Sequence, residues 1–122
     1  STLRQDSELD AVLGRLQAAK ENLLRAQERA GRSRKAEATA AALFDAGLPC
    51  GNDSNMGKML AADAAWHAAE ACMQTHGGFG YAREYDVERK WRETRLFQIA
   101  PVSTNLVLAY IGEHVLGLAR SY

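Results

Sequence analysis

The first 47 residues carry the pattern that most restricts how this chain can fold. Apolar side chains return every three or four residues along this stretch, with charged residues between them, which is typical of an amphipathic α-helix. The apolar positions are Leu9, Val12, Leu13, Leu16, Leu23, Ala30, Ala36, Ala40 and Leu43. Gly31 and Ser33 weaken the middle of the pattern without ending it. We therefore predict one long helix that can bend near Gly31.

The ends of this helix are marked by residues of known preference. Asp6 and Ser7 are both good N-caps, so the helix is predicted to begin near them. Gly47, Pro49 and Gly51 are predicted to end it.

Three further helices are predicted after this break. The second runs from a cap at Asp53 or Ser54 to about Thr75, and a Gly-rich connection over residues 76–86 follows. Its apolar stripe consists of Met59, Ala62, Trp66, Ala69 and Met73. The third helix runs from Val87 to about Gln98. After Pro101, Ser103 caps a last helix that reaches Leu116 or Gly117.

Composition agrees with an all-α fold. The chain has only two prolines and few β-branched residues, and its 122 residues suit one domain with one core. We predict an up-and-down, four-helix-bundle-like domain over residues 1–122.

Charge and hydropathy exclude several functions. The formal net charge is zero, so no basic excess indicates nucleic acid or a membrane surface as a partner. The most apolar stretch, Leu106 to Leu118, is too short to span a membrane. Cys50 and Cys72 lack zinc-ligand spacing, and we expect two free thiols in the cytoplasm, with Cys72 buried in its helix.

The run from Gln74 to Tyr81 is the strongest functional signal. It reads Gln-Thr-His-Gly-Gly-Phe-Gly-Tyr and follows an Ala-rich helix. Adjacent glycines after a helix expose backbone amides that phosphate oxygens can accept from. The plainer interpretation is that Gly77 and Gly78 only end the helix, with Gln74 facing solvent.

Other segments extend this signal in a fixed order along the chain. They are Gln17, Leu23-Leu24, Asp45-Ala46-Gly47, Lys58, Gln74, Gly77-Gly78, Gly80-Tyr81, Arg92-Glu93 and Phe97-Gln98-Ile99. Together they resemble the C-terminal helical domain of the flavin-dependent acyl-CoA dehydrogenases. The ordered set is far more specific than Gly-Gly-x-Gly-Tyr alone.

The resemblance implies a fragment of a larger flavoenzyme. In that family the domain follows an N-terminal helical domain and a β-domain, and it forms the core of a homodimer or tetramer. It also implies that Gln74, Gly77 and Gly78 lie against FAD bound mainly by a neighbouring subunit. The parent would dehydrogenate an acyl-CoA thioester, and this chain alone would be inactive.

Two departures from the family pattern bear on catalysis. The family often has a glutamate after the position of Ile99, which removes the α-proton while a hydride leaves for the flavin; here Pro101 stands there, so no catalytic residue is assigned. Either the base lies upstream of this chain, or the parent has lost dehydrogenation. The segment from Ile99 to Tyr122 resembles a bacterial subgroup of acyl-CoA dehydrogenases that has Ala-Pro at this place. This resemblance favours a catalytic base that lies upstream of this chain. Ser103, at the family's threonine position, still offers a hydroxyl to the flavin.

The second departure is at the beginning. The family has an arginine that pairs with the FAD pyrophosphate just before the long helix, followed by Phe-Gly. Residues 6–10 contain no arginine, and Arg4 lacks the Phe-Gly.

Several other features of the sequence suggest alternatives to the flavin site. A non-catalytic helical oligomerisation module remains the alternative function. Asp63, His67 and Glu70 share a helix face, but the Glu-x-x-His pairs of di-iron bundles are missing, so no metal is expected. We expect Arg92 to pair with a carboxylate on a neighbouring helix. Trp66, Trp91 and Tyr110 read as core or interface anchors, and Arg25, Glu28 and Arg29 as part of a solvated face.

Overall fold

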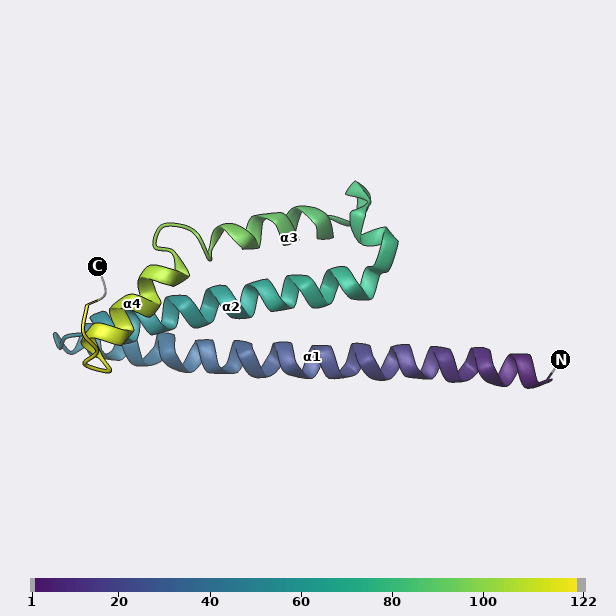
Figure 1. The fold of residues 1–122 in the computed structure, drawn as a ribbon, viewed down its shortest axis with the longest axis horizontal. Helices are drawn as coiled ribbons and strands as arrows, with labels where there is room; N and C mark the ends of the chain where they lie inside the picture. Colours follow the sequence, from purple (N-terminus) through teal and green to yellow (C-terminus); the bar gives the residue numbers. More distant parts are fainter. Residues whose placement is uncertain (1, 121–122) are drawn as a thin grey trace.

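The computed structural model describes residues 2–120, which form four α-helices and contain no strand (Figure 1). The helices are α1 (Thr2–Asp45), α2 (Gly51–His76), α3 (Val87–Leu96) and α4 (Thr104–His114). Two short 3-10 turns, η1 (Gly77–Tyr81) and η2 (Arg83–Tyr85), connect α2 to α3. The all-α expectation is confirmed. Ser121 and Tyr122, which the predicted domain and the resemblance include, lie outside the described residues, as does Ser1.

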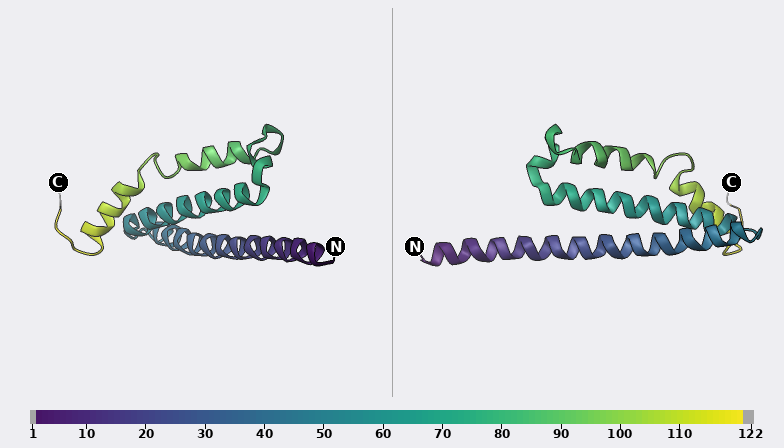
Figure 2. Two further views of the ribbon diagram at one scale, coloured as in Figure 1. Left: turned by 45° about the vertical axis from the view of Figure 1, so that its right-hand side comes forward. Right: turned by 180° about the vertical axis from the view of Figure 1, so that it is seen from behind.

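Helix α2 is the middle layer of the molecule. It packs against α1 on one side and against α3 on the other, while α4 contacts the N-terminal part of α2 (Figures 1 and 2). Helices α1, α2 and α3 alternate in direction. The N-terminal end of α1 projects beyond the end of α2 and has no neighbouring helix there (Figure 2).

Small residues permit the close approach of α1 and α2. Gly57, Ala62 and Ala64 of α2 are buried, and a Cβ atom on Gly57 would lie 3.6 Å from the backbone nitrogen of Glu37. Ser33, the buried residue of α1, donates to Glu37 Oε1 at 2.7 Å and so satisfies its hydroxyl within its own helix. The long helix continues unbroken through Gly31, because this face is supported by α2.

The single core expected from the chain length is small. Among residues 2–120 the buried apolar side chains are Ala62, Ala64, Val87 and Val107. The leucine stripe of α1 faces solvent instead, with Leu13 53% and Leu16 61% exposed. The stripe therefore forms a long exposed apolar surface on α1.

Helix ends differ from the predictions by a few residues. α1 begins at Thr2 and passes through Asp6 and Ser7, which therefore do not cap it. α2 begins at Gly51 after Cys50, with no side-chain cap, so neither Asp53 nor Ser54 has the predicted role. α3 ends at Leu96, two residues earlier than predicted, and α4 ends at His114, two or three residues earlier.

Two side-chain predictions are wrong and one is confirmed. Cys72 is exposed, in a hollow that it lines together with Val87 and Thr94 of α3, and both cysteines are free. Arg92 pairs with Glu88 of its own helix, one turn away. Ser103 does cap α4, since its Oγ accepts from the Leu106 amide at 3.3 Å. Within residues 2–120 no helix is both long and apolar enough to cross a membrane.

Candidate functional site

Gly77 ends α2 in a backbone conformation that suits only glycine. Its φ is 59° and its ψ is −138°, and its N–H donates to the carbonyls of Met73 and Gln74. A side chain at this position would meet its own backbone. Gly77 is therefore needed for a local reason, because this backbone conformation turns the chain away from the helix axis.

Gly80 and Gly78 are required for different reasons. Gly80 is buried, and a Cβ atom there would lie 2.5 Å from Met73 Sδ and 3.3 Å from the Met73 carbonyl oxygen. Gly78 has open space within 4 Å of such an atom, and its φ lies outside the left-handed region. Nothing within residues 2–120 thus demands glycine at Gly78, which is also exposed. Close approach of another molecule is one physical reason for a glycine there.

A groove of about 540 Å³ joins the predicted site residues to α3. It is lined by Glu70, Met73, Gln74, Gly77, Gly78, Tyr81, Glu88, Trp91 and Arg92. The structure therefore brings Gln74, Gly77 and Gly78 together in one concave surface, which we call the glycine groove. Its lining combines an aromatic wall with backbone and side-chain donors, which is typical of cofactor sites.

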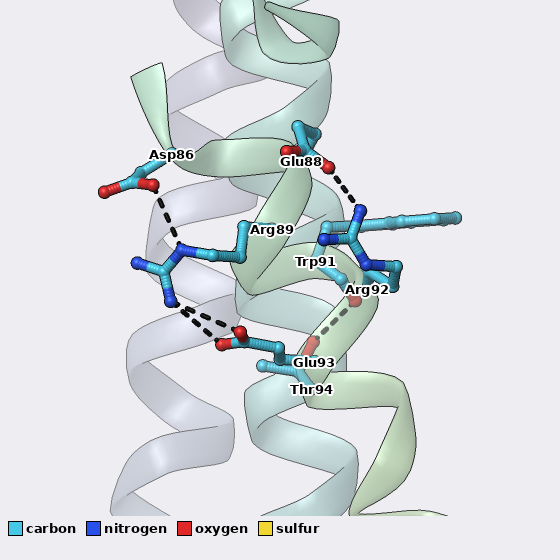
Figure 3. Close-up of polar contacts among 7 residues, drawn as sticks. All are labelled: Asp86, Glu88, Arg89, Trp91, Arg92, Glu93 and Thr94. Atoms are coloured by element: carbon cyan, nitrogen blue, oxygen red, sulfur yellow. Dashed lines mark hydrogen bonds and ion pairs between the residues drawn. The ribbon is translucent and has the colours of Figure 1, made fainter. Parts of the chain in front are cut away.

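The α3 wall of the glycine groove is held by polar contacts (Figure 3). Arg92 Nη1 donates to Glu88 Oε2 at 2.6 Å on the groove side. On the other side of α3, Arg89 bridges Asp86 and Glu93, each at 3.1 Å. The hydrogen bond and charge of Arg89 lower the pKa of Asp86, and these two carboxylates in turn raise the pKa of Arg89.

Trp91 is fixed from two directions. Its indole Nε1 donates to Glu70 Oε1 of α2 at 2.5 Å, and its ring lies 5.3 Å from that of Trp66. The Arg95 guanidinium stacks over Trp66 at 5.5 Å. The prediction that both tryptophans anchor helix contacts is thus confirmed for the α2–α3 pair. Tyr110 also links helices, by donating to Asn52 of α2 at 2.9 Å.

Ser103 does not join the glycine groove. It lies beyond the far end of α3, in the loop between Phe97 and Ser103, and Pro101 is exposed in the same loop. Lys58 of α2 holds this loop, because its Nζ donates to the carbonyls of Phe97 at 2.6 Å and Val102 at 2.5 Å. The resemblance points to Lys58, but no local pattern predicts a lysine that bonds two carbonyls so distant in sequence.

Of the residues expected on a solvated face, Arg25 and Glu28 are exposed, whereas Arg29 is half-buried and contacts α2. Arg29 Nη1 donates to Asp63 Oδ2 of α2 at 2.9 Å, and His67 Nδ1 lies 3.2 Å from Asp63 Oδ1. This contact crosses the α1–α2 interface, which the charge pattern of α1 alone cannot reveal. In the described residues no three histidine, cysteine or acidic side chains gather as they would around a metal ion.

Comparisons with known proteins agree on one family. Residues 1–116 match the family model described as acyl-CoA dehydrogenase, C-terminal domain. An acyl-CoA dehydrogenase of Bacillus subtilis is 38% identical over 78 residues, which cover 64% of this chain and 21% of that protein. The acyl-CoA dehydrogenase FadE12 of Mycobacterium tuberculosis is 40% identical over 85 residues, or 68% of this chain and 22% of that protein.

A third relative is the cyclohexane-1-carbonyl-CoA dehydrogenase of Geobacter metallireducens. It is 36% identical over 77 residues, which cover 63% of this chain and 20% of the relative. The chain thus spans about a fifth of the length of the curated relatives it matches. No solved structure matches it.

Proposed function

We propose, from the premise that this chain belongs to the acyl-CoA dehydrogenase family as its C-terminal domain, that it closes one wall of an FAD site and self-associates. The observation that carries the proposal is Gly78, a glycine with no internal reason to be one, in a groove that also contains Gln74 and Gly77. A cofactor that approaches the backbone closely supplies that reason.

The residues of the glycine groove fit part of FAD. Gln74 provides an amide donor and acceptor, the exposed glycines provide backbone amides, and Trp91 and Tyr81 provide apolar and aromatic surface. Such neutral donors suit an adenosine moiety held mainly by another subunit. Ser103, at the far end of α3, would donate to the flavin end of a cofactor.

Self-association is the second half of the proposal. The leucine stripe of α1 is exposed over several turns, and it projects beyond α2 where no described residue covers it. A homodimer or tetramer would bury this surface. Two free cysteines fit the reducing cytoplasm, where we place the protein.

The printed names of the three relatives above support a parent reaction. We propose that the whole protein dehydrogenates an acyl-CoA thioester, with FAD supplying the hydride acceptor. Proline has no proton to exchange, so Pro101 cannot act as the base, which then lies in a segment outside this chain. The isolated chain is therefore expected to be inactive.

Calorimetric titration of the purified chain with FAD tests the cofactor part. Gly78→Trp should abolish binding because it fills the glycine groove, and Gly14→Trp is the matched control, since Gly14 also has open space but lies on α1. Equal loss in both variants, or no binding by the wild-type chain, would count against the FAD site. Stable self-association without FAD binding would favour a non-catalytic helical module.

A further inference from the structure

Lys58 joins α2 to the segment of residues 97–103, which ends in Ser103. Its Nζ donates to the carbonyl oxygen of Phe97 at 2.6 Å and to that of Val102 at 2.5 Å, so it holds the segment close to both of its ends. The side chain is half-buried, and no carboxylate among residues 2–120 pairs with its ammonium group. Both bonds are therefore charge-assisted bonds from a cation to neutral carbonyls.

The remaining bonds of the segment lie within it or reach its immediate neighbours in sequence. The N–H and the hydroxyl of Thr104 both donate to the Gln98 carbonyl oxygen, at 3.0 and 3.3 Å. The Ala100 N–H donates to the Leu96 carbonyl oxygen at 2.8 Å. These bonds give the segment its shape, but none of them reaches α2. The two bonds from Lys58 are the ones that fix where the segment lies on α2.

Ser103 has two donors that no residue among 2–120 uses. Its Oγ accepts from the Leu106 N–H at 3.3 Å, which leaves the hydroxyl hydrogen for another acceptor. Its backbone N–H makes no hydrogen bond within the described residues. This N–H belongs to the same peptide group as the Val102 carbonyl, which accepts from Lys58. A charged donor at the carbonyl polarises the peptide group and so strengthens its N–H as a donor.

We propose that Lys58 is a positioning residue for the flavin end of the cofactor. It holds Ser103 at a fixed place on α2, and it strengthens the N–H that Ser103 offers to an electron-rich atom of the flavin. Lys58 acts through the segment 97–103 and does not itself contact the cofactor. This inference rests on the proposed function, in which Ser103 donates to the flavin.

The first test compares the affinities of the chain for FAD and for ADP, which lacks the flavin. Lys58→Met should weaken FAD binding about tenfold and leave ADP binding unchanged, because only the flavin end loses a contact. Lys58→Arg keeps the charge and offers several donors, so it should restore most of the FAD affinity. Lys35→Met, at an exposed position of α1, should change neither affinity. Equal losses for FAD and ADP in Lys58→Met would show a loosened fold and would overturn the proposal.

Two spectroscopic measurements report on the position and the polarisation of Ser103. The visible absorption spectrum of bound FAD depends on hydrogen bonds to the flavin, and Lys58→Met should move it towards the spectrum of free FAD. In the chain without cofactor, the NMR signal of the Ser103 amide proton should move upfield in Lys58→Met and stay in place in Lys58→Arg. An unchanged flavin spectrum or an unchanged Ser103 signal in Lys58→Met would overturn the role of Lys58.

Failure of this inference can be told apart from failure of the proposed function. If the wild-type chain binds FAD and ADP, and Lys58→Met changes neither the FAD affinity nor the spectrum, the cofactor site stands and the role of Lys58 is overturned. Equal wild-type affinity for FAD and ADP would overturn it as well, because the flavin end would then contribute nothing. If the wild-type chain binds neither molecule, the proposed function fails and the positioning role fails with it.

Discussion

The two connections at the ends of α3 are stabilised in opposite ways. The connection from α2, residues 77–86, takes its shape from the absence of side chains, at Gly77 for its backbone angles and at Gly80 for its packing. The connection to α4, residues 97–103, is tied to α2 by one long side chain, since Lys58 bonds two of its carbonyls, in addition to backbone bonds such as the one from Ala100 N–H to the Leu96 carbonyl. The first leaves an open groove, whereas the second is tied to α2.

This difference indicates which substitutions each connection tolerates. A loop shaped by missing side chains fails when one is added, and a loop tied by a lysine fails when that lysine is removed. Gly78 is the exception, because it lies in the first connection without being needed for its shape. Five substitutions test this contrast, and all free energies of unfolding should be compared at one protein concentration because self-association shifts them.

The largest effect is expected for Gly80→Val. The added Cβ would meet Met73 Sδ at 2.5 Å and the Met73 carbonyl oxygen at 3.3 Å, in a buried position. Overpacking of this kind costs about 3 kcal/mol. Urea unfolding followed by circular dichroism measures the loss. A cost near zero would mean that Met73 moves aside freely and that Gly80 does not fix the turn.

Gly77→Ala should destabilise the chain by about 2 kcal/mol, because its φ of 59° with ψ of −138° strains any side chain. Gly77→Asn should be no better than alanine, since ψ lies outside the left-handed helical region that asparagine tolerates. The same unfolding experiment checks both. Recovery of stability by asparagine would contradict the backbone geometry.

Lys58→Met should cost about 1–2 kcal/mol, for two hydrogen bonds to carbonyls from a charged donor. Amide hydrogen exchange should speed up over residues 97–106 and stay unchanged at the glycine connection. Lys35→Met is the control, because Lys35 is exposed on α1 and its ammonium bonds no other residue that the structure describes. Faster exchange at both ends of α3 would remove the contrast between the two connections.

Ser103→Ala should cost about 1 kcal/mol, the usual loss of an N-cap. Ser54→Ala, at a cap that was predicted but does not exist, should change stability much less. Exchange of the Leu106 amide reports the lost bond directly. Equal costs for the two serines would show that Oγ of Ser103 contributes nothing as a cap.

Gly78→Ala should have the smallest effect on folding and is expected to raise stability by about 0.5 kcal/mol, because the alanine restricts only the unfolded chain. The same variant should weaken FAD binding if the groove admits the cofactor. Thermal unfolding and calorimetry measure the two effects separately. Destabilisation would mean that Gly78 shapes the turn after all, like its neighbours.

Helices and their order follow from local signals in the sequence. The apolar period of α1 and the breakers Gly47 and Pro49 predict where this helix ends, and it ends at Asp45; Ser103 predicts the start of α4. Helix starts are harder to predict where an N-cap competes with neighbouring contacts. α2 begins at Gly51 although Asp53 and Ser54 are better N-caps. Tertiary packing decides such boundaries, and sequence propensity is weaker than packing.

The candidate site is predictable to a lesser extent. Gln74, Gly77 and Gly78 are neighbours in sequence, so their meeting in one groove follows from a single turn. Arg29 and Asp63 are separated by 34 residues, and their pairing depends on the register between α1 and α2. Cys72 shows the same limit, because its exposure depends on which side of α2 its neighbours cover.

The short link between α1 and α2 also determines the order in which the molecule assembles. Residues 46–50 join two antiparallel helices, so contacts near this link bring together nearby parts of the chain and cost little loop entropy. Pairing should then advance from Gly47 towards the other end of α2, where Gln74 and Thr75 lie close to residues 12–22 of α1. The same end should open first in native-state hydrogen exchange. A ligand bound there would stabilise the contacts between α1 and α2 that form last and open first.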